Sequence, residues 1–173
     1  MTPTFWSTHP TPVGDALIVV SDRGLVALEV GDQRDALARW ATQLGVPPES
    51  DPDAVAPVAR QLDEYFAAQR TDFDLAIDWR STGGFVRRAL QAVCTIDYGE
   101  TASYGEVAIL AGSPGAHRAA GSACARTPIS IIVPAHRVVR SDGSLGGYGG
   151  RPEVKRFLLD LEAPHSPVRT DGV

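Results

Sequence analysis

The sequence changes its pattern at a polar passage, residues 79–84. Before this passage, two β-branched runs at residues 15–21 and 25–30 are joined by a short Asp-Arg-Gly segment, which predicts a β-hairpin. After it, apolar residues recur mostly at helical spacing. The break therefore predicts an α/β (α+β) protein with a small α/β unit followed by a mostly helical one.

Amphipathic spacing predicts two helices in the first half, at residues 33–44 and 57–69. The first of them should stop at Gly-Val-Pro-Pro, residues 45–48, since this segment cannot continue a helix. We therefore expect an N-terminal α/β domain over residues 1–80.

The second half contains a pair of short helices separated by a turn. Its expected elements are three helices, an apolar strand and a last helix, at residues 85–96, 103–111, 115–125, 129–133 and 152–161. The glycine-containing turn 112–114 between the second and third helices is typical of a helix-turn-helix. We expect this domain to cover residues 81–163, followed by a loose tail at 164–173.

Charge is divided unevenly between the halves. Residues 1–80 carry 6 Lys/Arg against 13 Asp/Glu, whereas residues 81–160 carry 9 against 6. Nucleic acid responds to the local field of one face rather than to the total charge, which is −5 here. The second half could therefore meet a phosphate backbone; an uneven but merely solvated surface is the alternative.

Several classes of protein are disfavoured by composition. No apolar run approaches the length of a membrane span, and the N-terminus lacks the pattern of a secretory signal. Cys94 and Cys124 form neither a disulfide framework nor a zinc-type spacing, and Cys94, on an apolar helix face, is expected in the core. We expect a soluble, cytoplasmic protein with no metal and no cofactor, in which both thiols are inert.

The most informative stretch is Ile-Ile-Val-Pro-Ala-His-Arg-Val-Val, residues 131–139, followed by a Gly-Gly-Tyr-Gly-Gly loop at 146–150. The apolar strand should end at Pro134 and present the next three residues at its rim. Glycines around a tyrosine let the backbone approach a flat ligand closely. An ordinary strand end with a glycine-rich loop is the alternative.

At these residues the sequence resembles the O6-alkylguanine-DNA alkyltransferases, whose signature is Pro-Cys-His-Arg-Val followed by a glycine-rich loop with a tyrosine. The resemblance covers nearly the whole chain. It includes Tyr-Gly-Glu-Thr-x-Ser-Tyr-Gly-Glu-x-Ala at 98–108, Ala-Gly-Ser-Pro at 111–114, Arg-Ala at 118–119 and Leu-Leu-x-x-Glu at 158–162. It implies that the N-terminal domain is ribonuclease-H-like.

The resemblance also implies how DNA is bound. In that family the helix-turn-helix binds the minor groove of double-stranded DNA and rotates an O6-alkylated guanine out of the stack. Arg118 matches the arginine that fills the vacated space, and Tyr104 matches the tyrosine that presses on the 3′ phosphate. The remaining residues expected at the DNA are Ala119, Gly121, Ala123 and Arg137. The residues expected to form the lesion pocket are Pro134, Val138, Tyr148 and Gly149.

Catalysis in the family needs a cysteine thiolate, which a histidine held by a glutamate generates through water. His136 and Glu162 match the histidine and the glutamate, but Ala135 occupies the position of the nucleophile. A methyl group has no lone pair, so no alkyl transfer can occur there. Thr127 stands where the family has an asparagine that ties the turn to the pocket, and threonine can make fewer hydrogen bonds.

Two departures favour a natural protein that binds the lesion without alkyl transfer, like the alkyltransferase-like proteins, and leave enzymatic activity open. One alternative is a suicide methylated-DNA–protein-cysteine methyltransferase whose cysteine was replaced at Ala135, or one that uses Cys124. Another is a sequence-reading regulator, which is disfavoured because small residues surround Arg118. We expect a monomer whose partners are double-stranded DNA with O6-alkylguanine and proteins of nucleotide excision repair.

Overall fold

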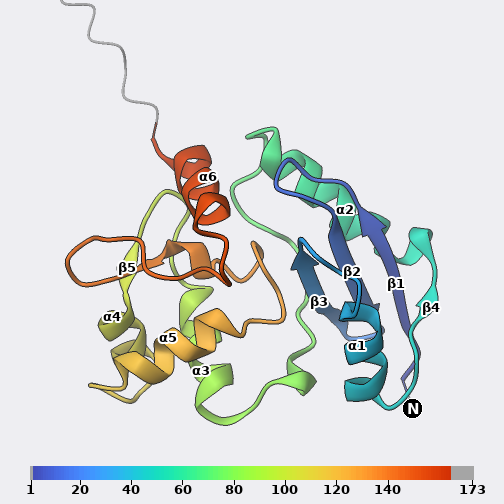
Figure 1. The fold of residues 1–173 in the computed structure, drawn as a ribbon, viewed down its shortest axis with the longest axis horizontal. Coiled ribbons are helices and arrows are strands. Elements are labelled where there is room, and N and C mark those ends of the chain that lie inside the picture. The colour runs from blue at the N-terminus through green and yellow to red at the C-terminus, as the bar shows by residue number, and fades with distance from the viewer. Residues whose placement is uncertain (1, 165–173) are drawn as a thin grey trace, which may run out of the picture.

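The first half is a four-stranded sheet with a helix on each face (Figure 1). The computed structural model describes residues 2–164, and the strands of this sheet follow the order β3-β2-β1-β4. The elements are β1 (Thr4–His9), β2 (Ala16–Ser21), β3 (Gly24–Val30), α1 (Ala36–Leu44), β4 (Glu49–Ser50) and α2 (Pro52–Phe66). The antiparallel pairing of β2 with β3 confirms the predicted hairpin.

The alternation of side chains along β2 explains the two layers of helix. Leu17 and Val19 pack in one cluster with Trp40 of α1, whereas Ile18 belongs to the cluster that contains Leu62 of α2. Successive side chains on a strand point to opposite faces, so a fully apolar strand can bury both. The sheet is therefore the centre of the first half.

Helix α2 begins five residues earlier than its spacing predicted. The Asp51 carboxylate accepts hydrogen bonds from the backbone N–H groups of Asp53 and Ala54, and Pro52 occupies the first turn, where no N–H is needed. Pro57, expected to open the helix, instead lies inside it. Apolar spacing alone therefore missed the first turn, which the Asp51 cap and Pro52 define.

The second half is mostly helical, as predicted. Its elements are η1 (Trp79–Ser81), α3 (Gly84–Val93), β5 (Ala102–Ser103), α4 (Tyr104–Leu110), α5 (His117–Ala125), η2 (Ala135–Arg137), β6 (Val138–Val139) and α6 (Pro152–Glu162), where η denotes a 3₁₀ turn. Helices α4 and α5 are the expected pair of short helices. Ser103 and Glu106 form a reciprocal capping box that fixes the start of α4.

The strand predicted at residues 129–133 is wrong. Ile129 makes one isolated bridge to Leu28, after which the backbone turns, and Ile131 adopts a φ of 70°. The pairing of β6 with β5 comes after Pro134 rather than before it. The segment is apolar because it is buried between the two halves, and burial alone does not distinguish a strand from a turn.

The edge of β3 holds this turn in place. The N–H of Leu28 donates to the carbonyl of Pro128 (2.9 Å), and the N–H of Ser130 donates to the carbonyl of Leu28 (2.8 Å). Farther along, the Arg151 guanidinium donates to the carbonyl of Val13 (2.9 Å), and a side chain on Gly31 would meet it at 2.6 Å. Both segments that flank the Pro-Ala-His-Arg-Val motif are thus fixed to the first half.

None of the helices within residues 2–164 combines the length and the apolar character of a membrane span. The same residues contain no group of three or more His, Cys, Asp or Glu side chains arranged to hold a metal ion. The predicted loose tail lies, from residue 165 onward, outside the described residues.

Candidate functional site

The Glu162 carboxylate, in the last turn of α6, is the centre of a buried hydrogen-bonded cluster. Its Oε1 accepts from Tyr65 Oη (2.6 Å), His136 Nε2 (2.8 Å) and Arg137 Nη2 (2.9 Å), and its Oε2 accepts from Arg137 Nε (2.8 Å). Burial alone would raise the pKa of Glu162, but the donors from His136 and Arg137 outweigh it and lower the pKa to about 2. The carboxylate is therefore ionised at neutral pH.

His136 is fully buried and uses only one of its two ring nitrogens. Because Nε2 faces an ionised acceptor, it carries the proton, and Nδ1 has no hydrogen-bond partner within the described residues. Burial lowers the pKa of His136 more than Glu162 raises it. The ring is thus neutral near pH 7, with an unprotonated nitrogen available as a base.

Ala135 begins the η2 turn immediately before this histidine. Its side chain is a methyl group, and the residue is 4% exposed. The turn places Ala135 and His136 on consecutive buried positions of one short helix, whereas the sequence predicted them at the rim of a strand. The site therefore contains the base and its carboxylate partner, but no nucleophile at Ala135.

Arg137 was expected at the DNA, and this expectation is wrong. Its side chain is buried against Glu162, and its Nη1 donates to the carbonyl of Ile96 (2.6 Å). A guanidinium held by a carboxylate and a carbonyl inside the core is not available to a phosphate. The expected rim position depended on a strand at 129–133, and that strand does not form.

Helices α4 and α5 line an open groove of about 710 Å³. The residues that line it are Ser103, Tyr104, Gly105, Gly115, His117, Arg118, Gly121, Arg140, Ser141 and Asp142. Arg118 and Ala119 are exposed, and Gly121 lies against the ring of Tyr104. The structure thus brings Tyr104, Arg118 and Gly121, three of the residues expected at the DNA, to one groove.

Ala123 was also expected at the DNA, but it is fully buried. It follows Ala120 by three residues and precedes Cys124, and all three lie on the face of α5 that packs into the core. Helical periodicity separates this face from the one that carries Arg118. The small size of Ala123 therefore serves the packing of helices, not an approach to a ligand.

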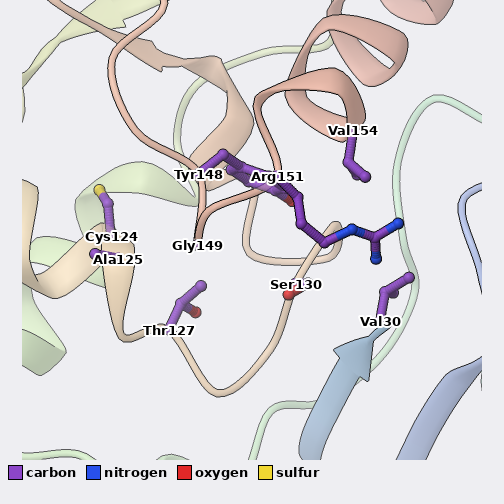
Figure 2. Close-up of a pocket in the computed structure, with 9 residues that line it drawn as sticks. All are labelled: Val30, Cys124, Ala125, Thr127, Ser130, Tyr148, Gly149, Arg151 and Val154. Carbon is purple, nitrogen blue, oxygen red and sulfur yellow. The ribbon is translucent and has the colours of Figure 1, made fainter. Parts of the chain in front are cut away.

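A second cavity, of about 110 Å³, lies between the halves (Figure 2). Its lining residues are Val30, Cys124, Ala125, Thr127, Ser130, Tyr148, Gly149, Arg151 and Val154. Tyr148 and Gly149, two of the four residues expected in the lesion pocket, are among them. The other two, Pro134 and Val138, are buried and do not line it.

Thr127 forms both of its side-chain hydrogen bonds within its own turn. Its hydroxyl donates to the carbonyl of Ile129 and accepts from the N–H of the same residue, each at 3.3 Å. The side chain borders the second cavity, but it reaches neither Tyr148 nor the loop by a hydrogen bond.

Lys155, which the sequence analysis did not select, holds the glycine-rich loop. It is fully buried, and its Nζ donates to the carbonyls of Val138 (2.6 Å), Leu145 and Gly147 (3.5 Å). Burial lowers its pKa to about 8. Its position one residue after Val154 and three before Leu158, on the apolar face of α6, was the signal that could have identified it. Arg140 in the groove and Tyr65 were likewise missed.

The two thiols differ in their surroundings. Cys94 was expected in the core but is exposed, because α3 ends at Val93 and the chain leaves the apolar face there. Cys124 is buried and borders the second cavity, where burial raises its pKa to about 11. A thiol with this pKa is almost entirely protonated at neutral pH.

Comparison with known proteins matches each half of the chain to a domain of one family. The family model described as the 6-O-methylguanine DNA methyltransferase, ribonuclease-like domain, matches residues 4–79, and the DNA binding domain of the same family matches residues 84–164. A methylated-DNA–protein-cysteine methyltransferase of Mycolicibacterium paratuberculosis is 42% identical over 94% of each chain. One of Mycobacterium tuberculosis is 50% identical over 68% of this chain and 71% of its own.

Solved structures agree with this assignment. The crystal structure of Mycobacterium tuberculosis O6-methylguanine methyltransferase superposes with a TM-score of 0.82 at 39% identity, over 95% of this chain and 96% of the other. A Mycobacterium tuberculosis structure in complex with DNA superposes with a TM-score of 0.80 at 39% identity, over 93% and 96% of the two chains. The chain therefore belongs to the 6-O-methylguanine DNA methyltransferase family.

Proposed function

We propose that this protein binds double-stranded DNA containing O6-alkylguanine, rotates the modified base out of the stack and does not accept its alkyl group. The observation that carries the proposal is Ala135, an inert methyl group, directly before the buried base His136. The chemistry of the family requires a nucleophile at this position. Without it, recognition is what the remaining residues can still perform.

Three features of the α4–α5 groove support DNA binding. Arg118 is exposed and lines the groove together with Tyr104, and Gly121 lies beside the ring of that tyrosine. Arg140 adds a second exposed cation at the rim. A side chain that fills the space of a rotated base offsets part of the cost of unstacking.

The other thiol near the site does not replace the missing nucleophile. Cys124 borders the cavity with Tyr148, yet its pKa of about 11 leaves almost no thiolate at neutral pH. His136, the unprotonated base, does not line that cavity. We therefore assign no alkyl transfer to Cys124.

The alternative is a suicide methyltransferase in which a natural cysteine has been replaced at Ala135. The hydrogen bond between His136 Nε2 and Glu162 fits this alternative, since the pair is what a neighbouring thiol would need. Thr127 argues against it, because a single engineered change would leave the family's asparagine in place. We infer that this is a natural binding protein that acts as a monomer. It would pass the lesion to proteins of nucleotide excision repair. Its two domains would cover residues 1–80 and 81–163.

Binding can be tested by fluorescence anisotropy with two duplexes that differ only in one O6-methylguanine. We expect a lower Kd for the modified duplex at the same salt concentration, since the phosphate contribution is common to both. Equal Kd values would contradict the proposal. A marked preference for one undamaged sequence would instead support a sequence-reading regulator.

Transfer can be tested separately by intact mass after incubation with methylated DNA. We expect no gain in mass for the protein as it stands. A gain of one methyl group would show that another residue, with Cys124 the first to examine, acts as nucleophile. The Cys124→Ser variant would identify it.

A further inference from the structure

Tyr65 reaches the candidate site from the other half of the molecule. It lies on α2, is fully buried and is surrounded by the rings of Phe66, Phe73 and Tyr98, with centroids 5.3, 5.4 and 6.2 Å away. Its hydroxyl hydrogen-bonds the Glu162 carboxylate, 97 residues later in the sequence. A side chain of the N-terminal half thus contacts Glu162, the carboxylate that also bonds His136.

The direction of this hydrogen bond is fixed by its surroundings. A carboxylate oxygen only accepts, so the Tyr65 hydroxyl must donate. The same oxygen, Oε1, also accepts from His136 Nε2. The phenol and the imidazole therefore donate to the same oxygen atom. Each additional donor reduces the negative charge on this oxygen and so reduces how strongly it stabilises a protonated imidazole.

We propose that Tyr65 is a positioning residue through which the N-terminal half controls His136. By donating to Oε1, its hydroxyl keeps the imidazole neutral, with the proton on Nε2 and with Nδ1 unprotonated. Loss of the hydroxyl would leave a more strongly negative oxygen beside His136 and favour the charged imidazolium. Tyr65 would thus act at the site of the proposed function, and this role does not depend on lesion binding.

Other charged groups around His136 stay the same when this hydroxyl is removed. Arg137, on the same turn, and Lys155, on α6, both oppose protonation of the ring, whereas Glu162 favours it. The arginines of α3, which packs against η2, bond elsewhere: Arg87 to Thr82 and Trp79, and Arg88 to Ala111. Tyr98, beside the cluster, gives its hydroxyl to the carbonyl of Leu161.

The Tyr65→Phe variant removes the hydroxyl and keeps the ring. Nitrogen-15 NMR of the histidine rings across a pH series would report the tautomer and protonation of His136, which is assigned by its loss in His136→Gln. We expect the unmodified protein to show the Nε2–H tautomer. Tyr65→Phe should raise the protonation midpoint of His136 and increase its proton affinity several-fold.

Tyr98→Phe is the matched control, since it removes a neighbouring hydroxyl that does not bond Glu162. It should leave the His136 titration unchanged. Equal behaviour of the two variants would reduce Tyr65 to a space-filling role and overturn the proposal. So would finding the proton on Nδ1 in the unmodified protein.

A second measurement keeps the test informative if Tyr65→Phe does not fold. Replacing tyrosine with 3-fluorotyrosine throughout the chain, which has 4 tyrosines, makes each phenol more acidic and a stronger donor. The protonation midpoint of His136 should then fall, opposite to the variant, and the same labelling in Tyr98→Phe should give the same fall. An unchanged midpoint would count against Tyr65. None of these measurements uses DNA, so they succeed or fail independently of lesion binding.

Discussion

The buried cluster around Glu162 and the open groove between α4 and α5 lie in the same half of the molecule but satisfy their polar groups differently. In the cluster, Glu162 and Arg137 bond each other and their neighbours inside the protein. In the groove, the side chains of Arg118 and Arg140 are exposed and form no hydrogen bond or ion pair within the described residues.

This difference changes what each region says about function. A buried charge that loses its partner costs several kcal/mol, so folding by itself requires the cluster. The presence of His136 and Glu162 beside Ala135 is therefore weak evidence for catalysis. Exposed arginines contribute little to folding, and their place in the groove is better evidence that the protein binds an anionic ligand there.

The largest effect is expected for Ala135→Cys, which tests whether the buried cluster can support catalysis. If the cluster still forms a working base, the variant should gain one methyl group from methylated DNA, where the parent gains none. Intact mass over time measures this change. Ala135→Cys combined with Thr127→Asn tests divergence: a faster reaction in the double variant would show that Thr127 limits transfer.

Glu162→Gln should strongly destabilise the fold. Arg137 would lose its charged partner inside the core, and we expect a loss of about 3–5 kcal/mol in the free energy of unfolding. Urea denaturation measures it. Glu153→Gln on the same helix removes an exposed carboxylate and should cost less than about 1 kcal/mol. Similar losses for the two variants would contradict the role given to the cluster.

Acid should weaken the same cluster. The folded-state pKa of Glu162, about 2, lies below its unfolded value, so its contribution is complete above the unfolded pKa and declines as pH falls toward 2. His136, whose pKa is lowered by burial, adds a loss that begins below about pH 6.5. We expect a decrease of about 2–3 kcal/mol between pH 7 and 3, reduced in Glu162→Gln.

Arg118→Ala should act on binding and leave folding nearly unchanged. We expect about 2 kcal/mol, roughly a thirtyfold increase in Kd for a duplex with O6-methylguanine, because no side chain then fills the vacated stack. Binding to a single strand should weaken less. Arg126→Ala, an exposed arginine of the region after α5 that does not line the groove, is the control.

Arg140→Ala should have the smallest effect. A single phosphate contact adds little affinity at physiological salt, and its loss should reduce the slope of log K against log salt by about 1. The loss should be alike for modified and unmodified duplexes. A loss confined to the modified duplex would place Arg140 at the lesion instead.

Local sequence patterns predicted the helices and strands better than they predicted which side chains are exposed. The hairpin, α1 and the α4–α5 pair follow from periodicity and turn residues, and they formed where expected. The position of Arg137 could not be predicted in this way, because its partners, Glu162 and Ile96, are 25 and 41 residues away. The periodicity of α5 did indicate that Ala123 faces inward, whereas small size alone does not distinguish helix packing from a close approach to DNA.

The strand predicted at 129–133 was wrong for a similar reason. Its apolar residues are buried between the halves, and its two hydrogen bonds with Leu28, one donated and one accepted by that residue, join it to β3, far earlier in the sequence. Lys155 and Tyr65 are absent from the predicted site because their roles arise only when α6 and α2 are packed.

The contact of Arg151 with the first half makes the shape of the second cavity depend on Gly31, a residue far from the recognition motif. A methyl group there would collide with the guanidinium that borders the cavity, and φ at Gly31 is 113°, which disfavours any other residue. A substitution of Gly31 would thus reshape the second cavity beside Tyr148, although no described residue of the first half lines the α4–α5 groove.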